Sequence, residues 1–187
     1  MQGFLIGNII LWSNGAIWKR LSDIGAPYLS ASNKSVGVGQ LERSLWFTIE
    51  TGQVVRGTMT SAVRLAETEG LLRRGTITGN AILWDDGRNW TRLPDLRGDW
   101  TRSSSAAPTY VEQSGAALLF VNEVGATAAA RFTSPFRIET TAEFGQVLSV
   151  FSIGPGTLLF SNGWLWKKSV ATALDPIFAR WKLWPHI

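Results

Sequence analysis

Residues 7–21 read GNIILWSNGAIWKRL, and residues 79–93 read GNAILWDDGRNWTRL, so the same pattern returns 72 positions later. A third copy, TLLFSNGWLWKK, occupies residues 157–168, with Phe160 at the position of the first tryptophan and Trp166 at that of the second. Self-similarity at a fixed spacing indicates a repeat protein, in which each repeat forms one supersecondary unit. The sequence therefore predicts a fold built by duplication.

The similarity extends beyond these three stretches. Leu45-Trp46-Phe47 aligns with Leu118-Leu119-Phe120 at a spacing of 73, and an insertion in a loop explains the drift of one residue. We therefore expect three segments along the chain. They are a first repeat unit at residues 1–78, a second repeat unit at residues 79–155, and a third hairpin with the C-terminal segment at residues 156–187.

Each repeated stretch has the features of a β-hairpin. Asn14-Gly15, Asp86-Gly87 and Asn162-Gly163 are dipeptides that favour type I′ turns, because both central residues of such a two-residue loop need a positive φ. Runs of β-branched and aromatic residues bounded by glycine predict further strands, whereas helix signals are few. We therefore predict an all-β chain, a tandem repeat of two similar β-rich units built on antiparallel, Trp-containing hairpins.

The paired tryptophans of the hairpins are the first candidates for function. If Asn14-Gly15 is a two-residue loop, Trp12 pairs with Ile17 and Trp18 pairs with Leu11. Because adjacent strand residues point to opposite faces, one tryptophan should face the core and leave the other for an interface or a ligand. Core packing or subunit contact is the favoured role, and a sugar-stacking platform is the alternative. The candidate interface or glycan-stacking residues are Trp12, Trp18, Trp84, Trp90, Trp164 and Trp166.

The C-terminal segment carries the clearest helix signal. Asp175-Pro176 resembles an N-cap followed by proline at the first helical position. Phe178, Trp181 and Trp184 would then lie on one apolar face of a short helix or tail, which is too short to be stable alone. We expect this segment to be an assembly contact.

The composition argues against several classes of function. The chain has no cysteine and a single histidine, His186, so we expect no disulfide, metal site or cofactor. The net charge of +4 comes from scattered basic residues rather than a basic stripe, which disfavours nucleic-acid binding. The N-terminus does not resemble a signal peptide, and no apolar run is long enough to span a bilayer, so we expect no membrane insertion.

Carboxylates are the plausible catalytic groups in this composition. Glu50 and Glu123 match between the repeats, and Asp85-Asp86 lies at a hairpin tip, where aspartate is a common turn residue. A catalytic pair requires two carboxylates that converge in a cleft and differ in pKa. A duplicated structural glutamate explains Glu50 and Glu123 more simply. We therefore predict no enzymatic activity, with polysaccharide cleavage as the alternative.

A short motif follows the second hairpin. The run Leu93–Gly98, Leu-Pro-Asp-Leu-Arg-Gly, resembles the signature of bacteriophage tail-collar and tail-fibre proteins. In that family an aromatic residue and another Arg-Gly usually follow. Trp100 and Arg102 approximate this pattern, whereas Ser103 replaces the glycine. The first unit carries a degraded version, Leu-Ser-Asp-Ile-Gly, at residues 21–25.

The resemblance implies a structural protein of the virion, synthesised in the cytoplasm of a host bacterium. It implies a β-rich homo-oligomer, with a trimer favoured, that contacts other virion proteins and attaches to the host surface, where polysaccharide would be a partner. Two other function classes stay open. One is a carbohydrate-binding module or lectin that uses exposed tryptophans, and the other is a polysaccharide-cleaving enzyme.

Overall fold

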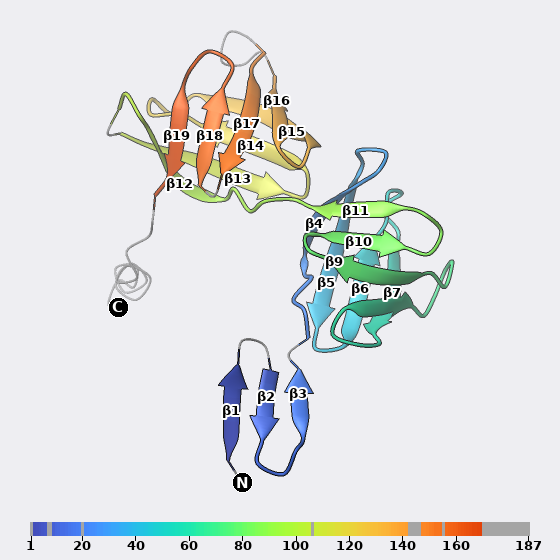
Figure 1. The fold of residues 1–187 in the computed structure, drawn as a ribbon. Coiled ribbons are helices and arrows are strands. Elements are labelled where there is room, and N and C mark those ends of the chain that lie inside the picture. The colour runs from blue at the N-terminus through green and yellow to red at the C-terminus, as the bar shows by residue number, and fades with distance from the viewer. Residues whose placement is uncertain are drawn as a thin grey trace, which may run out of the picture. The chain divides into compact units, whose positions relative to one another are not determined.

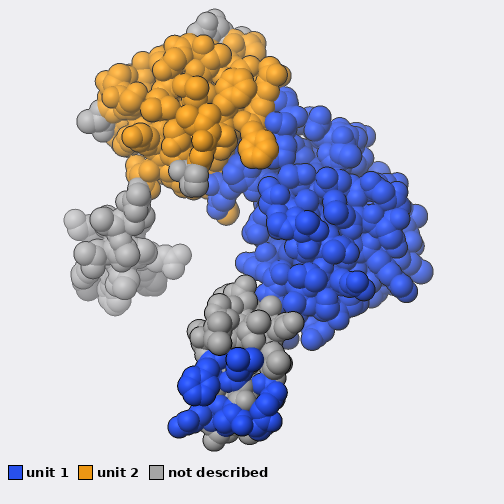
Figure 2. All heavy atoms as spheres, viewed as in Figure 1, with its two compact units in different colours: residues 1–95, 114–117, 131–135 blue, residues 96–113, 118–130, 136–187 orange. Residues whose placement is uncertain are grey.

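A computed structural model describes residues 2–6, 9–19, 21–105, 107–141, 147–154 and 156–169. Every regular element in these residues is a β-strand, so the all-β prediction is confirmed. The chain divides into two compact units, residues 1–95 with 114–117 and 131–135, and the remainder (Figure 2). The helix expected near the C-terminus lies outside the described residues.

The N-terminal strands form a sheet of their own (Figure 1). It contains β1 (Gly3–Ile6), β2 (Ile9–Trp12) and β3 (Ile17–Lys19) in antiparallel order.

The next eight strands form a closed antiparallel barrel in which each strand pairs with its neighbours in the chain and β11 returns to β4. Closure pairs the backbone groups that would otherwise lie on exposed edge strands. The strands are β4 (Ala26–Ser30), β5 (Ser35–Leu41), β6 (Ser44–Thr48), β7 (Val54–Met59), β8 (Arg64–Glu67), β9 (Arg74–Thr78), β10 (Ala81–Trp84) and β11 (Asn89–Arg92).

A second barrel repeats this plan, with β19 returning to β12. Its strands are β12 (Gly98–Arg102), β13 (Pro108–Ser114), β14 (Ala117–Val121), β15 (Thr127–Ser134), β16 (Arg137–Thr140), β17 (Ser149–Gly154), β18 (Thr157–Phe160) and β19 (Leu165–Lys168).

The repeated hairpins supply the last two strands of each barrel. Strands β10 and β11 close the first barrel, and β18 and β19 close the second. The hairpin at the head of one sequence repeat therefore completes the barrel begun by the preceding repeat. The barrels therefore span residues 26–92 and 98–168. Their boundaries do not coincide with those of the sequence repeat units, which are residues 1–78 and 79–155.

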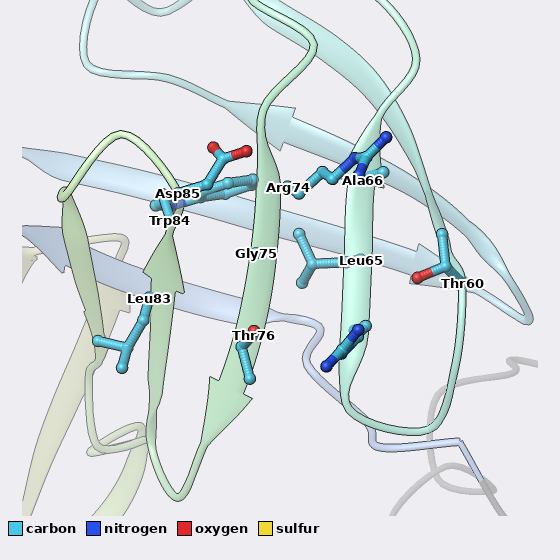
Figure 3. Close-up of a pocket in the computed structure, with 10 residues that line it drawn as sticks. Thr60, Leu65, Ala66, Arg74, Gly75, Thr76, Leu83, Trp84 and Asp85 are labelled. Carbon is cyan, nitrogen blue, oxygen red and sulfur yellow. The ribbon is translucent and has the colours of Figure 1, made fainter.

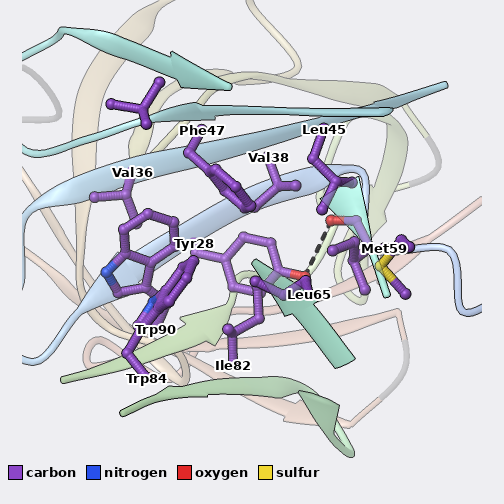
Figure 4. Packing of buried hydrophobic residues seen from close by; sticks show 12 residues of the cluster. Tyr28, Val36, Val38, Leu45, Phe47, Met59, Leu65, Ile82, Trp84 and Trp90 are labelled. Carbon is purple, nitrogen blue, oxygen red and sulfur yellow. Dashed lines mark hydrogen bonds between the residues drawn. The ribbon is translucent and has the colours of Figure 1, made fainter. Parts of the chain in front are cut away.

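The interior of each barrel is filled by alternate strand residues. Along β6 the burial alternates, so that Leu45 and Phe47 point inward while their neighbours face solvent. This follows from the two-residue period of a strand. The first core, drawn in Figure 4, contains Ile24, Tyr28, Val36, Val38, Leu45, Phe47, Val55, Met59, Leu65, Ile82, Trp84 and Trp90.

Candidate functional site

The hairpin turns differ from the type I′ turns that the sequence predicts. The Trp84 N–H donates to the Arg88 carbonyl at 2.9 Å, so the loop between these paired residues contains Asp85, Asp86 and Gly87. Gly87 has a φ of 83°, and Asp86 is not among the residues with positive φ. A type I′ turn would need positive φ at both positions, whereas a three-residue loop places one glycine in the left-handed region.

This additional loop residue places both tryptophans of a hairpin on the same face. Ile82 pairs with Trp90, and Trp84 lies two residues beyond Ile82, so all three side chains point into the barrel. Trp84 is 4% exposed and Trp90 is 2% exposed. The prediction that one tryptophan faces outward is therefore wrong for this hairpin, because a one-residue change in register reverses the face of a strand residue.

The buried hairpin aromatics form the same cluster in both barrels. In the first, the rings of Trp84 and Trp90 lie 5.0 Å apart, and Phe47 packs edge-on against them at 5.3 and 6.0 Å. In the second barrel, the equivalent rings of Phe120, Phe160 and Trp166 lie 4.9 to 5.7 Å apart. Such contacts add about 0.5–1.5 kcal/mol per pair beyond the burial of area. The repeated aromatics therefore hold the closing hairpin to the rest of its barrel.

The other candidate aromatics fall into two groups. Trp164 is half-buried, and the Arg102 guanidinium lies 4.2 Å from its ring centroid. The backbone of Trp12 and Trp18 belongs to β2 and β3, but their side chains lie outside the described part of the chain. The assembly residues proposed at the C-terminus, Phe178, Trp181 and Trp184, also lie outside it.

The two matched glutamates have structural partners in separate barrels. Hydrogen bonds from the hydroxyls of Ser30 and Ser32 lower the pKa of the Glu50 carboxyl below its ordinary value. Glu123 accepts a hydrogen bond from Arg102 Nη1 at 2.8 Å. Ser30 ends β4 and Arg102 ends β12, so each glutamate binds the first strand of its own barrel.

The Leu93–Gly98 motif and its degraded copy at residues 21–25 make the same contacts in the two units. The Leu96 N–H donates to Gln113 Oε1 at 2.8 Å, and Trp100 Nε1 donates to the Leu96 carbonyl at 2.9 Å. In the degraded copy, the Ile24 N–H donates to Gln40 Oε1 at 2.8 Å, and the Ile24 carbonyl accepts from the Tyr28 hydroxyl at 3.0 Å. Figure 4 draws the second bond as a dashed line from Tyr28. In each copy one buried aliphatic residue is thus fixed at the entry to the first strand.

A buried ion pair distinguishes the first barrel. Arg73 and Glu67 are both 5% exposed, and the Arg73 Nε and Nη2 groups donate to Glu67 Oε1. The Arg73 guanidinium also lies 4.6 Å from the Trp84 ring centroid and 3.7 Å from the Asp86 carboxylate. In the second barrel, Thr140 and Leu148 stand at the positions of Glu67 and Arg73. There the Leu148 N–H donates to Thr140 Oγ1 at 2.9 Å, and the contact carries no charge.

The outer face of β8, β9 and β10 carries a groove that the sequence did not reveal (Figure 3). Its volume is about 750 Å³, within the range of roughly 300–1,000 Å³ found for small-molecule sites. One cross-strand row joins Arg64, Thr76 and Leu83, and a second joins Ala66 to Arg74. Asp85 adjoins Arg74 through a backbone hydrogen bond of 2.9 Å, and Thr60, Leu65, Gly75 and Trp84 complete the lining.

The groove could not be found from spacing because its residues come from three strands and alternate with core residues. The arginines are scattered in the sequence, and the register of β8 against β9 places Arg64 and Arg74 on one outward face. Among the described residues there is no cluster of three side chains suited to a metal ion, and no helix is long and apolar enough to cross a membrane.

No protein-family model, curated protein or solved structure matches the chain.

Proposed function

We propose that the chain is a non-enzymatic structural component of a bacteriophage particle, of the fibre or attachment type. The observation that carries this proposal is the burial of the repeated hairpin aromatics. Trp84, Trp90, Phe160 and Trp166 are each at most 4% exposed, so the residues that define the repeat serve the architecture of the barrels. This supports a protein whose repeats are building units.

The motif Leu93–Gly98 gives a second line of support. Leu93 is buried at the end of the first barrel, and Leu96 is buried at the start of the second. The residues that resemble phage tail proteins thus connect consecutive barrels. In this proposal the chain forms a homo-oligomer, a trimer being favoured, and assembles with other virion proteins.

Sedimentation equilibrium of the purified full chain tests the assembly. We expect a mass three times that of one chain, concentration-independent in the micromolar range. A chain that stays monomeric would contradict the fibre proposal. Immunoelectron microscopy with an antibody against the chain then tests whether the chain is part of the virion, and we expect the antibody to label bacteriophage particles. A preimmune serum is the control.

A further inference from the structure

In the second barrel, the surface equivalent to the groove is occupied by side chains of the protein itself. The row Arg137, Phe151 and Leu159 crosses β16, β17 and β18 in the register that Arg64, Thr76 and Leu83 adopt on β8, β9 and β10. The Arg137 guanidinium lies 6.0 Å from the Phe151 ring centroid. Thr76 stands in the place of this ring, so the first barrel lacks it.

A carboxylate is missing from the first barrel as well. Arg137 Nη2 forms an ion pair with Glu139 at 3.0 Å. The residue that corresponds to Glu139 is Ala66, two positions after Arg64, as Glu139 is two positions after Arg137. In the part of the chain that the structure describes, neither Arg64 nor Arg74 forms an ion pair, and both are exposed. The groove therefore offers two guanidinium groups and space for a ring.

The remaining polar groups favour a hydroxylated ring. The hydroxyls of Thr60 and Thr76 can donate or accept, and the Asp85 carboxylate accepts hydrogen bonds from hydroxyl groups. Asp85 would repel a polyphosphate that covered the whole groove. Leu83, which is 45% exposed, and Ala66 supply an apolar surface for the face of the ring.

We propose that the groove on β8, β9 and β10 binds a carboxylated saccharide, that is, a chain containing uronic acid units. Arg64 and Arg74 hold carboxylates through charge-assisted hydrogen bonds, which are the stronger class and geometrically specific for guanidinium. Leu83 contacts the apolar face of a sugar ring, and Asp85 accepts from its hydroxyls. This inference rests on the attachment part of the proposed function and gives its ligand a chemical class.

Isothermal titration calorimetry with trigalacturonate tests the proposal on the full chain at low salt. The methyl ester of trigalacturonate, which keeps the sugar rings and removes their charge, is the first control, and inorganic phosphate is the second. We expect binding of trigalacturonate only. Equal binding of the ester or of phosphate would overturn the assignment to a carboxylated sugar.

The variant Thr76→Phe fills the groove with the side chain that the second barrel carries at this position. Because Phe151 occupies the equivalent place beneath an arginine, we expect the variant to fold normally and to lose at least tenfold in affinity. Thr48→Phe is the matched control, because Thr48 is exposed on β6, away from the groove, and it should bind as the unmodified chain does. Arg64→Ala should also weaken binding at least tenfold.

Retained binding in Thr76→Phe, with an unchanged circular dichroism spectrum, would overturn the inference. The oligomeric mass separates the two proposals. A monomer that binds trigalacturonate contradicts the fibre assembly and leaves the groove assignment standing. A trimer that does not bind it contradicts the groove assignment alone.

Discussion

Replacing Glu67 by threonine, the residue at the equivalent position of the second barrel, should destabilise the first barrel strongly. The change leaves the Arg73 guanidinium, which is 5% exposed, with the more distant Asp86 as its acidic partner at 3.7 Å. Breaking a buried pair in this way costs about 3–5 kcal/mol of unfolding free energy, since an uncompensated charge stays buried. Arg73→Leu, which strands Glu67 instead, should cost a similar amount and also remove the contact with Trp84.

The double variant Glu67→Thr with Arg73→Leu reproduces the uncharged contact between Thr140 and Leu148 in the second barrel. Exchanging a buried ion pair for well-packed uncharged residues is often neutral or stabilising. We therefore expect the free energy of unfolding of the double variant to lie within about 2 kcal/mol of that of the unmodified chain. The summed cost of the two single variants would then exceed the cost of the double variant by roughly 4 kcal/mol or more, which is the coupling energy of the pair.

Urea unfolding combined with hydrogen exchange on peptides from residues 26–92 measures these changes in the first barrel. Glu69→Thr is the control, because Glu69 forms an exposed ion pair with Arg56 at 4.0 Å and should contribute less than about 1 kcal/mol. A double variant as unstable as the sum of the single variants would refute the reasoning. So would single variants that cost less than about 1 kcal/mol.

Three further outcomes are expected. Burial raises the pKa of Tyr28 from 10.0 to about 12, so the folded protein favours the neutral phenol. The free energy of unfolding, compared with that of Tyr28→Phe, should therefore be constant below pH 10 and fall by roughly 2–3 kcal/mol as the pH rises to 12. Urea unfolding at each pH measures this difference. Gly57→Ala should lower the free energy of unfolding by about 1–3 kcal/mol in the same assay, because its new β-carbon would lie 2.6 Å from a backbone carbonyl oxygen of β8. Gly37→Ala is the control, because its new β-carbon would have its nearest contact at 3.7 Å and should not cause this loss. Trp84→Phe should cost no more than about 2 kcal/mol in thermal unfolding, because Phe160 fills that position in the second barrel, and complete loss of folding would contradict the equivalence of the two clusters.

The duplication and the β-strand class were readable from the sequence because both depend on local patterns. Strand periodicity and the glycine of each hairpin tip are local, and Gly15, Gly87 and Gly163 all adopt a positive φ. The face of each tryptophan was not readable in this way. It depends on whether a loop has two or three residues, and Asn-Gly and Asp-Gly dipeptides suit both kinds of turn.

Closure and the groove were beyond sequence reasoning for a different reason. The hairpin of one repeat pairs with the first strand of the preceding unit, as Trp90 does with Ser30, and no local pattern encodes a partner so far along the chain. The groove lies on three consecutive strands, β8, β9 and β10, and the register that brings Arg64, Arg74 and Leu83 onto one outward face depends on the two loops between them. The buried pair of Arg73 and Glu67 was missed because charged residues are ordinarily exposed.

The offset between sequence repeat and barrel has a consequence for how such chains change length. Recombination between the matching codons of Gly7 and Gly79 would excise residues 7–78 and rejoin β1 to β10. The product would again begin with a three-stranded sheet and continue into an intact closed barrel. A crossover within the matching hairpin heads removes or adds one complete barrel, so a gene of this kind can gain or lose units there without passing through a protein with a broken one.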